Sequence, residues 1–332
     1  MYQNLKIFLK KIDKNIKFLK KLIIHHNSLT IYKCIICIFL YIIIILIKLN
    51  QNKSFHRLTI CICTVGKQEN NYINEFIEFY HRYGIDKIFL YDNNNINGEY
   101  FENVIEKYIN LNFVEIINWR GIKSPQMMIY HDCYNKNFDN FDWLIFNDID
   151  EYLYLKNYHN IKDFLKQNKF KKCQNIQLNW LLYTDNNLMN YENKPLQVRF
   201  TEKDPNLYQR EIKKYSNGKS ILRGHIKNIK IVNFHCISNE LKTCDGFGIE
   251  RKILKADYKF YYFKHYYCKS TEEFVEKLKK GDVYHISNNI KIDFYFSYNK
   301  ITYEKLDFIE KKTGENLTLY RNKLLLNNSL KI

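Results

Sequence analysis

The sequence predicts an α/β protein, with a mostly parallel twisted sheet flanked by helices and a single N-terminal transmembrane helix in front of it. Two observations carry this prediction. Apolar, β-branched segments alternate with amphipathic segments between Leu58 and Asp148, which is typical of strands joined by crossover helices. A long apolar run with a basic flank precedes them at residues 29–47. A chain of 332 residues that is 46% hydrophobic can also bury a large core.

The N-terminal arm holds most of the positive charge. Residues 1–57 carry eleven Lys and Arg against one acid, so they account for +10 of the formal net charge of +17. The rest of the sequence is mildly basic, and no basic stretch in it is interleaved with stacking aromatics in the manner of a nucleic-acid surface. We therefore expect no nucleic-acid partner. Residues 4–24 are basic and amphipathic, which suits the anionic face of a membrane.

The apolar run at residues 29–47 approaches the roughly 20 residues that span a bilayer. Seven Lys lie in residues 1–28 and few basic residues follow the run. The positive-inside rule then places the N-terminus in the cytosol and residues 50–332 across the membrane, in the Golgi or secretory lumen of a eukaryotic cell. The main alternative is a buried helix of the folded domain. The predicted divisions are a cytosolic arm (1–28), a signal anchor (29–48), a short stem (49–57), a folded domain (58–285) and a helical C-terminal extension (286–332).

The alternating half predicts four strands with helices between them. The strands are expected at 58–66, 86–92, 113–119 and 142–148, and the helices at 70–84, 99–110 and 124–138. The second half is less regular. It predicts strands at 175–183, 229–237 and 260–268, a loop-rich region at 184–224 and a helix at 271–281.

The nine cysteines do not form a metal or disulfide framework. If the domain is lumenal, one or two disulfides are expected among the scattered cysteines of residues 133–268, and Cys236–Cys244 is the easiest local pair.

A tight acidic cluster, FNDIDEYLYL at residues 146–155, follows the apolar strand segment WLIF. Asp148, Asp150 and Glu151 lie where the fourth strand ends, and ligands of parallel sheets bind beyond the carboxyl ends of the strands. Carboxylates that converge where the chain turns suit Mg²⁺ or Mn²⁺, which can offset charge on a diphosphate leaving group. Two other interpretations stay open: a solvated acidic turn, and the nucleophilic Asp of a D-x-D phosphohydrolase.

Four blocks of sequence follow one another along the chain: KQENNYINEFIEFYHRYGIDKIFLYDN at 67–93, WLIFNDIDEYL at 143–153, GKSIL at 218–222 and HYYCKSTEEFVEKLKKG at 265–281. Their order and spacing resemble glycosyltransferase family 92 and related family-2-like transferases, a group once described as a domain of unknown function. The resemblance runs from about Thr59 to Gly281. Gln68 stands where the family usually has Asn, and Phe76 where it usually has Trp.

The resemblance implies a GT-A fold over residues 58–285 and a generally inverting glycosyltransferase with Mn²⁺ or Mg²⁺, which the N-terminal apolar run would anchor in the membrane. The donor would be a nucleotide sugar, with UDP-galactose first, and the acceptor a glycan or glycoconjugate. Two alternatives are weighed beside it. One is a non-catalytic glycan-binding protein on this fold, which the departures at Gln68 and Phe76 would favour, and the other is the phosphohydrolase.

Metal and base roles follow from the resemblance and from the position of each residue. We expect Asp148 and Asp150 to hold the metal and the donor diphosphate, with His265 as a candidate third metal ligand. An inverting displacement also needs a group that deprotonates the acceptor hydroxyl. The candidates for this base are Glu151, Asp245 and His235.

Further donor contacts are expected at two other strand ends and from lysines. Glu69 and Asp92 would contact the nucleotide, and Lys219 and Lys269 could bind phosphate. Each has a structural alternative. Asp92 could cap the Asn-rich loop that follows it, Glu69 could be a helix N-terminal charge, and either lysine could be solvated.

Overall fold

The computed structural model describes residues 41–42, 57–123, 125–207, 218–233, 240–251, 256–280 and 288–329. The chain forms two compact units, Met1–Arg57 and Leu58–Ile332. In the first unit, Tyr41 and Ile42 are described as exposed helical residues, and Arg57 as an exposed residue outside the helices and strands. The anchor expected at 29–48 otherwise lies outside the described residues. Of the helices that are described, none combines the length and the apolar character that a bilayer crossing requires.

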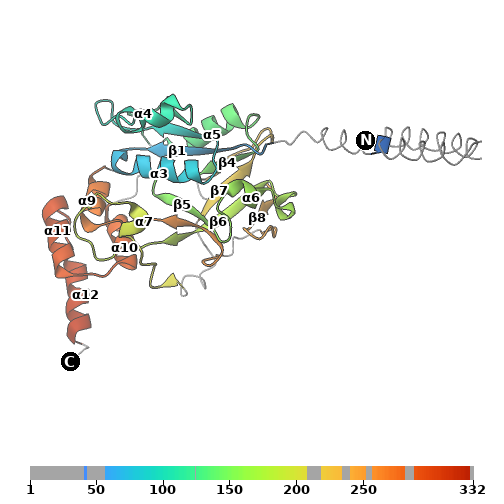
Figure 1. Cartoon of the computed structure of the whole chain (residues 1–332). Helices are drawn as coiled ribbons and strands as arrows, with labels where there is room; N and C mark the ends of the chain where they lie inside the picture. The colour runs from blue at the N-terminus through green and yellow to red at the C-terminus, as the bar shows by residue number, and fades with distance from the viewer. Residues whose placement is uncertain are drawn as a thin grey trace, which may run out of the picture. The chain divides into compact units, whose positions relative to one another are not determined.

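Four parallel strands form the first half of the sheet, as the alternation predicts (Figure 1). They are β1 (Ile60–Gly66), β2 (Lys87–Asp92), β3 (Val114–Asn118) and β4 (Trp143–Phe146), with α3 (Asn70–Arg82), α4 (Glu102–Asn110) and α5 (Gln126–Asn137) between them. β1 pairs in parallel with β2 and β4, and β2 pairs in parallel with β3. The carboxyl ends of these strands therefore share one edge of the sheet.

The second half of the chain makes the sheet mixed rather than mostly parallel. It adds β5 (Glu151–Leu155), β6 (Asn175–Leu182), β7 (Gly218–Arg223), β8 (Thr243–Cys244) and β9 (Tyr261–His265), which gives the order β3-β2-β1-β4-β7-β6-β9-β5 with β8 beside β6. The β4–β7, β6–β7 and β5–β9 pairings are antiparallel. Strict strand–helix alternation is what signals parallel pairing, and this half lacks it in the sequence.

Two segments differ from their predicted elements, and burial explains both. Residues 229–233, the described part of the strand expected at 229–237, form no strand. Ile229 and Ile231 are instead buried in the hydrophobic cluster that includes α5, so their apolar character serves packing rather than pairing. Conversely, β7 is a strand within the region expected to be loop-rich. The sequence did not indicate it because Lys219, although fully buried, interrupts the apolar pattern of the segment.

The remaining helices are α6 (Ile161–Leu165), the 3₁₀ turn η1 (Asn168–Phe170), α7 (Leu196–Arg199), α9 (Thr271–Lys280), α10 (Asn288–Tyr298), α11 (Tyr303–Thr313) and α12 (Thr318–Ser329). α9 to α12 gather on one side of the domain (Figure 1). They share a hydrophobic cluster of their own, in which Phe274 of α9 stacks on Tyr295 of α10 at 4.1 Å between ring centroids. The division expected at residue 285 stays a prediction.

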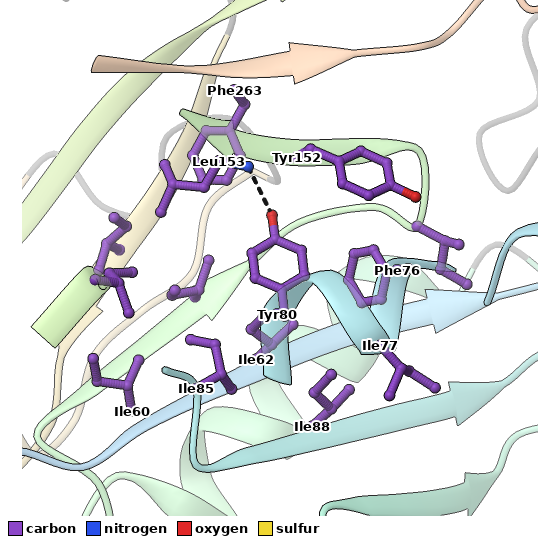
Figure 2. Packing of buried hydrophobic residues seen from close by; sticks show 14 of the residues in the cluster. Ile60, Ile62, Phe76, Ile77, Tyr80, Ile85, Ile88, Tyr152, Leu153 and Phe263 are labelled. Carbon is purple, nitrogen blue, oxygen red and sulfur yellow. Dashed lines mark hydrogen bonds between the residues drawn. The ribbon is translucent and has the colours of Figure 1, made fainter. Parts of the chain in front are cut away.

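Helix α3 is helical because its apolar residues recur at three- and four-residue spacing and face one core. Its buried residues are Tyr72, Ile73, Phe76, Ile77 and Tyr80. Figure 2 shows the Tyr80 hydroxyl reaching β5, where it accepts a hydrogen bond from the backbone N–H of Leu153 at 3.0 Å. The same hydroxyl donates to the carbonyl of Glu151 at 2.9 Å and accepts from the side-chain amide of Asn147 at 2.9 Å. One buried tyrosine thus fixes both ends of the acidic segment.

The structure contains a disulfide between Cys173 and Cys244, with Cα atoms 5.8 Å apart. The local pair Cys236–Cys244 is therefore wrong. β8 pairs with β6 through the register Asn175↔Thr243, and this pairing brings two cysteines together that are 71 residues apart in the chain. Sequence distance alone could not indicate this contact.

Candidate active site

The acidic segment forms a tight turn between β4 and β5. The backbone N–H of Asp148 donates to Oε2 of Glu151 at 3.0 Å, and the N–H of Glu151 donates to the carbonyl of Asp148 at 3.1 Å. Ile149, inside this turn, lies against the end of β1, where a Cβ on Gly66 would come within 2.9 Å of its side chain. The same Cβ would lie 2.5 Å from the ring of Phe101, so the turn and Phe101 together leave little room for a side chain at position 66.

Three side chains converge at this turn: Asp150, Glu151 and His265. β5 and β9 are antiparallel and pair Glu151 with His265, which brings the imidazole to the turn. Nε2 of His265 lies 3.4 Å from Oδ1 of Asp150 and 3.9 Å from Oε1 of Glu151. We call these three residues the metal trio. Asp148 is not among them, although the sequence pattern pairs it with Asp150.

The metal trio fits a divalent cation. Two ligands of an octahedral ion at about 2.1 Å are about 3 Å apart when adjacent and about 4.2 Å apart when opposite, and the observed separations fall in this range. Oε1 of Glu151 is buried and has no hydrogen-bond partner among the described residues. Two carboxylates and one imidazole form a donor set that suits Mn²⁺.

Burial and neighbouring charges set the protonation of the metal trio. Burial lowers the pKa of His265 more than Asp150 raises it, so the imidazole is neutral, the form that binds metals. Burial raises the pKa of Asp150, but Lys277 and His265 outweigh it and hold that pKa well below its usual range. Burial and the carboxylates of Asp148 and Asp150 raise the pKa of Glu151 well above its usual range, against the opposing effect of Lys219. A bound cation would stabilise the charged form of Glu151.

Lys219 lies beneath the carboxylates rather than in an open donor site. Its side chain is fully buried, and Nζ lies 2.8 Å from Oδ2 of Asp148 and 3.6 Å from Oε2 of Glu151. The side-chain amide of Gln126 donates to the other oxygen of Asp148 at 3.0 Å. Asp148 is nevertheless one third exposed. It is therefore held in place while keeping a surface that a ligand can contact.

A cavity of about 460 Å³ lies between the loop after β1 and helix α9. Three of its lining residues are lysines, at positions 269, 277 and 280. Lys277 connects the cavity to the metal trio, since its Nζ lies 3.5 Å from Oδ2 of Asp150. Glu69 also lines the cavity and pairs with Lys280 at 2.5 Å. Sequence reasoning missed Lys277 and Lys280, whose three-residue spacing on one helix face was hidden among the chain's many lysines.

Asp92 and Asp245 are not brought to the metal trio. Asp92 is 2% exposed; it accepts from Nη1 of Arg120 at 2.5 Å and from the backbone N–H of Asn94 at 2.9 Å. These contacts agree with the alternative role, in which Asp92 holds the loop after β2, and the nucleotide contact stays a prediction.

Asp245 likewise holds its own loop, accepting from two backbone N–H groups and from Arg251 at 2.9 Å. The adjacent Gly246 abuts Tyr261 at the start of β9, whereas His265 ends that strand. Four residues of strand place the start of β9, near Asp245, about 13 Å from His265 at its end. His235 lies outside the described residues.

Comparison with known proteins decides the family. A model of glycosyltransferase family 92 matches residues 56–310, which is most of the chain. The chain belongs to glycosyltransferase family 92. The resemblance inferred from the ordered sequence blocks is therefore confirmed, and the acidic segment at residues 146–155 lies within the match.

Curated relatives in family 92 match a smaller part. A family 92 protein of Oryza sativa subsp. japonica is 28% identical over 127 residues, covering 36% of this chain and 20% of the relative. One of Ricinus communis is 27% identical over 107 residues, covering 32% of this chain and 19% of the relative. The matched segment thus spans about a fifth of the length of these relatives.

Two solved structures align with this family 92 chain at low similarity. TarS of S. aureus in complex with UDP has a TM-score of 0.36 at 10% identity, covering 73% of this chain and 70% of that chain. The mannosyltransferase PcManGT from Pyrobaculum calidifontis, in complex with GDP-Man and Mn²⁺, has a TM-score of 0.34 at 6% identity, covering 83% and 81%.

Proposed function

We propose that this family 92 protein is a metal-dependent glycosyltransferase that moves a sugar from a nucleoside diphosphate donor to a glycan acceptor with inversion. The observation that carries the proposal is the metal trio. A buried carboxylate oxygen of Glu151 without a partner among the described residues faces Nε2 of His265, beside Asp150. Mn²⁺ or Mg²⁺ would be held there, and a UDP-sugar, UDP-galactose first, is the donor that the family resemblance favours.

The chain's own residues prepare the site for this chemistry. Asp150, Glu151 and His265 would hold the cation, which when bound offsets the charge that develops on a diphosphate leaving group. Lys219 pairs with Asp148 and Glu151 from the protein interior and holds them in place. Asp148 stays one third exposed, so the donor could contact it. Because Oε1 of Glu151 faces the metal position, we assign Glu151 to cation binding rather than to the general base. Asp245 remains a candidate base.

The test is metal-dependent donor hydrolysis and transfer by the full-length chain, with a panel of nucleotide sugars. We expect release of the nucleoside diphosphate with Mn²⁺, its loss on chelation and its loss in Asp150→Asn. Asp163→Asn, on the exposed surface of α6, is the matched control and should retain activity. Glycan binding without hydrolysis of any donor would favour the non-catalytic alternative. Phosphate release from a simple phosphoester, dependent on Asp148 and indifferent to nucleotide sugars, would favour a phosphohydrolase.

We further propose a single-pass membrane protein with a cytosolic N-terminus and a lumenal catalytic domain. The disulfide Cys173–Cys244 supports this, because disulfides persist mainly in oxidising compartments. Protease treatment of sealed vesicles decides the orientation. Protection of the domain supports the proposal, and its digestion in intact vesicles contradicts it.

A further inference from the structure

We propose that Lys269 and Lys277 bind the diphosphate of the donor, and that Glu69 positions them rather than touching the nucleotide. This inference rests on the proposed function and assigns one wall of the cavity beside the metal trio. Lys269, Lys277 and Glu69 all line that cavity, whose volume of about 460 Å³ is within the usual range for small-molecule sites.

Lys269 carries a buried ammonium group whose ion pairs are long. The residue is 6% exposed, and its Nζ lies 3.7 Å from Oε2 of Glu69 and 4.0 Å from Oδ2 of Asp150. Both distances exceed that of a hydrogen bond. The same Nζ lies 3.9 Å from the centroid of the Tyr72 ring, which holds the cation in place. The ammonium group therefore has donors to offer a ligand that enters the cavity.

The backbone at Lys269 supports the same assignment. Its φ is 50°, in the left-handed region that residues other than glycine seldom adopt. Such a conformation is strained and recurs at ligand-binding sites. Gln68, across the cavity, also has a positive φ, of 53°. Two strained positions thus border one cavity.

Lys277 approaches the same carboxylate oxygen from helix α9. Its Nζ lies 3.6 Å from the centroid of the Tyr267 ring and 3.5 Å from Oδ2 of Asp150. Oδ1 of Asp150 instead faces His265. The two carboxylate oxygens of Asp150 thus have different neighbours: Oδ1 lies near His265, and Oδ2 lies near Lys269 and Lys277. A phosphate group at this boundary would be near both a cation and two ammonium groups.

Glu69 acts through the lysines. One oxygen pairs with Lys280 at 2.5 Å, and the other lies 3.7 Å from Lys269 without a hydrogen bond to any described residue. The Glu69 carbonyl also accepts the first hydrogen bonds of α3. The residue therefore joins the start of α3 to the end of α9. An acidic side chain among these lysines would repel a diphosphate if it contacted it directly, so we assign Glu69 a positioning role.

The experiment measures nucleotide binding by calorimetry with the full-length protein, using UDP and UMP with and without Mn²⁺. Lys269→Met and Lys277→Met should each weaken UDP binding about tenfold to a hundredfold, the effect of one charge-assisted hydrogen bond, and should change UMP binding far less. Lys279→Met is the matched control, because Lys279 is an exposed lysine of the same helix that does not line the cavity and pairs with Glu276. It should bind UDP as wild type does. Glu69→Gln should lower the preference for UDP over UMP, and Glu69→Asp should restore part of it.

The outcomes separate this inference from the proposed function. If wild type binds no UDP in any arm, the proposed function fails. If wild type binds UDP and both Met variants bind it within twofold, the lysine assignment alone is overturned. Equal losses of affinity for UDP and UMP in the Met variants would also overturn it. Stronger competition with UDP binding by orthophosphate than by pyrophosphate would overturn it in favour of a phosphorylated acceptor. Should a Met variant unfold, its Arg counterpart, which keeps the charge, must still bind UDP.

Discussion

Replacing Lys219 with Met tests whether this lysine supports the acidic turn from inside the protein. The side chain is fully buried, and it neutralises Asp148 at 2.8 Å and Glu151 at 3.6 Å. Met has a similar length and lacks the charge, so the substitution removes the ion pairs with little change in packing. If Lys219 were instead an open donor contact, its loss would alter donor binding and leave the stability of the free protein unchanged.

The expected cost follows from the burial of each partner. Removing one member of a buried ion pair usually costs about 3–5 kcal/mol, because the remaining charge stays buried. Asp148 is one third exposed and keeps its hydrogen bond from Gln126, which reduces the loss. Glu151 is wholly buried and can shed part of the penalty by binding a proton. We therefore expect about 3 kcal/mol, or a fall in Tm of about 6–12 °C for a domain of this size.

Thermal unfolding of the full-length chain, with and without Mn²⁺, measures this effect. Mn²⁺ should raise Tm more in Lys219→Met than in wild type, because the cation then supplies the missing positive charge. Lys279→Met, which breaks an exposed pair on α9, should cost less than about 0.5 kcal/mol. A Lys219→Met protein that melts within about 1 °C of wild type would refute the supporting role.

Three further predictions concern stability. Tyr80→Phe leaves the buried hydrogen-bonding groups of the acidic segment without their partner and should cost about 2–3 kcal/mol in denaturant unfolding; a loss below about 0.5 kcal/mol would contradict this. The double change Cys173→Ser, Cys244→Ser opens a 71-residue loop and should cost about 4 kcal/mol, with reductant producing the same loss in wild type only. Burial raises the pKa of Glu273, but hydrogen bonds, led by that from Arg199, outweigh it, so its net pKa is lowered. The carboxylate's stabilising effect is therefore present above its unfolded pKa of about 4.3 and is lost as pH falls through the lower folded value. The difference in free energy of unfolding between wild type and Glu273→Gln should be largest above about pH 5 and should decrease in acid.

Local pattern was sufficient for one half of the fold. The segments between Leu58 and Phe146 alternate strictly, and all four strands and three helices of that half were predicted from residue spacing. In the second half, the strands pair across long sequence separations, as β5 does with β9. Strand direction there depends on tertiary contacts, which single-sequence periodicity does not contain. The disulfide between Cys173 and Cys244 was missed for the same reason.

The candidate site shows the same limit at the scale of single side chains. Asp150 was predicted as a metal ligand from its place after a strand, and His265 from its place in a sequence block. The structure brings them together with Glu151 because β9 lies antiparallel to β5. Lys219 was expected to face the donor, and only its position on β7 shows that it is buried beneath the turn.

The geometry of the turn decides which carboxylates of the D-x-D-E segment converge. The sequence predicts that the carboxylates meet where the chain turns after the fourth strand. The chain does turn between β4 and β5, and the N–H of Asp148 donates to one carboxylate oxygen of Glu151. This contact leaves the other oxygen of Glu151 facing His265 and turns Asp148 toward Gln126 and Lys219. A family motif therefore identifies the segment that carries the chemistry, while the hydrogen bonds of the turn decide which of its acids meet at one point.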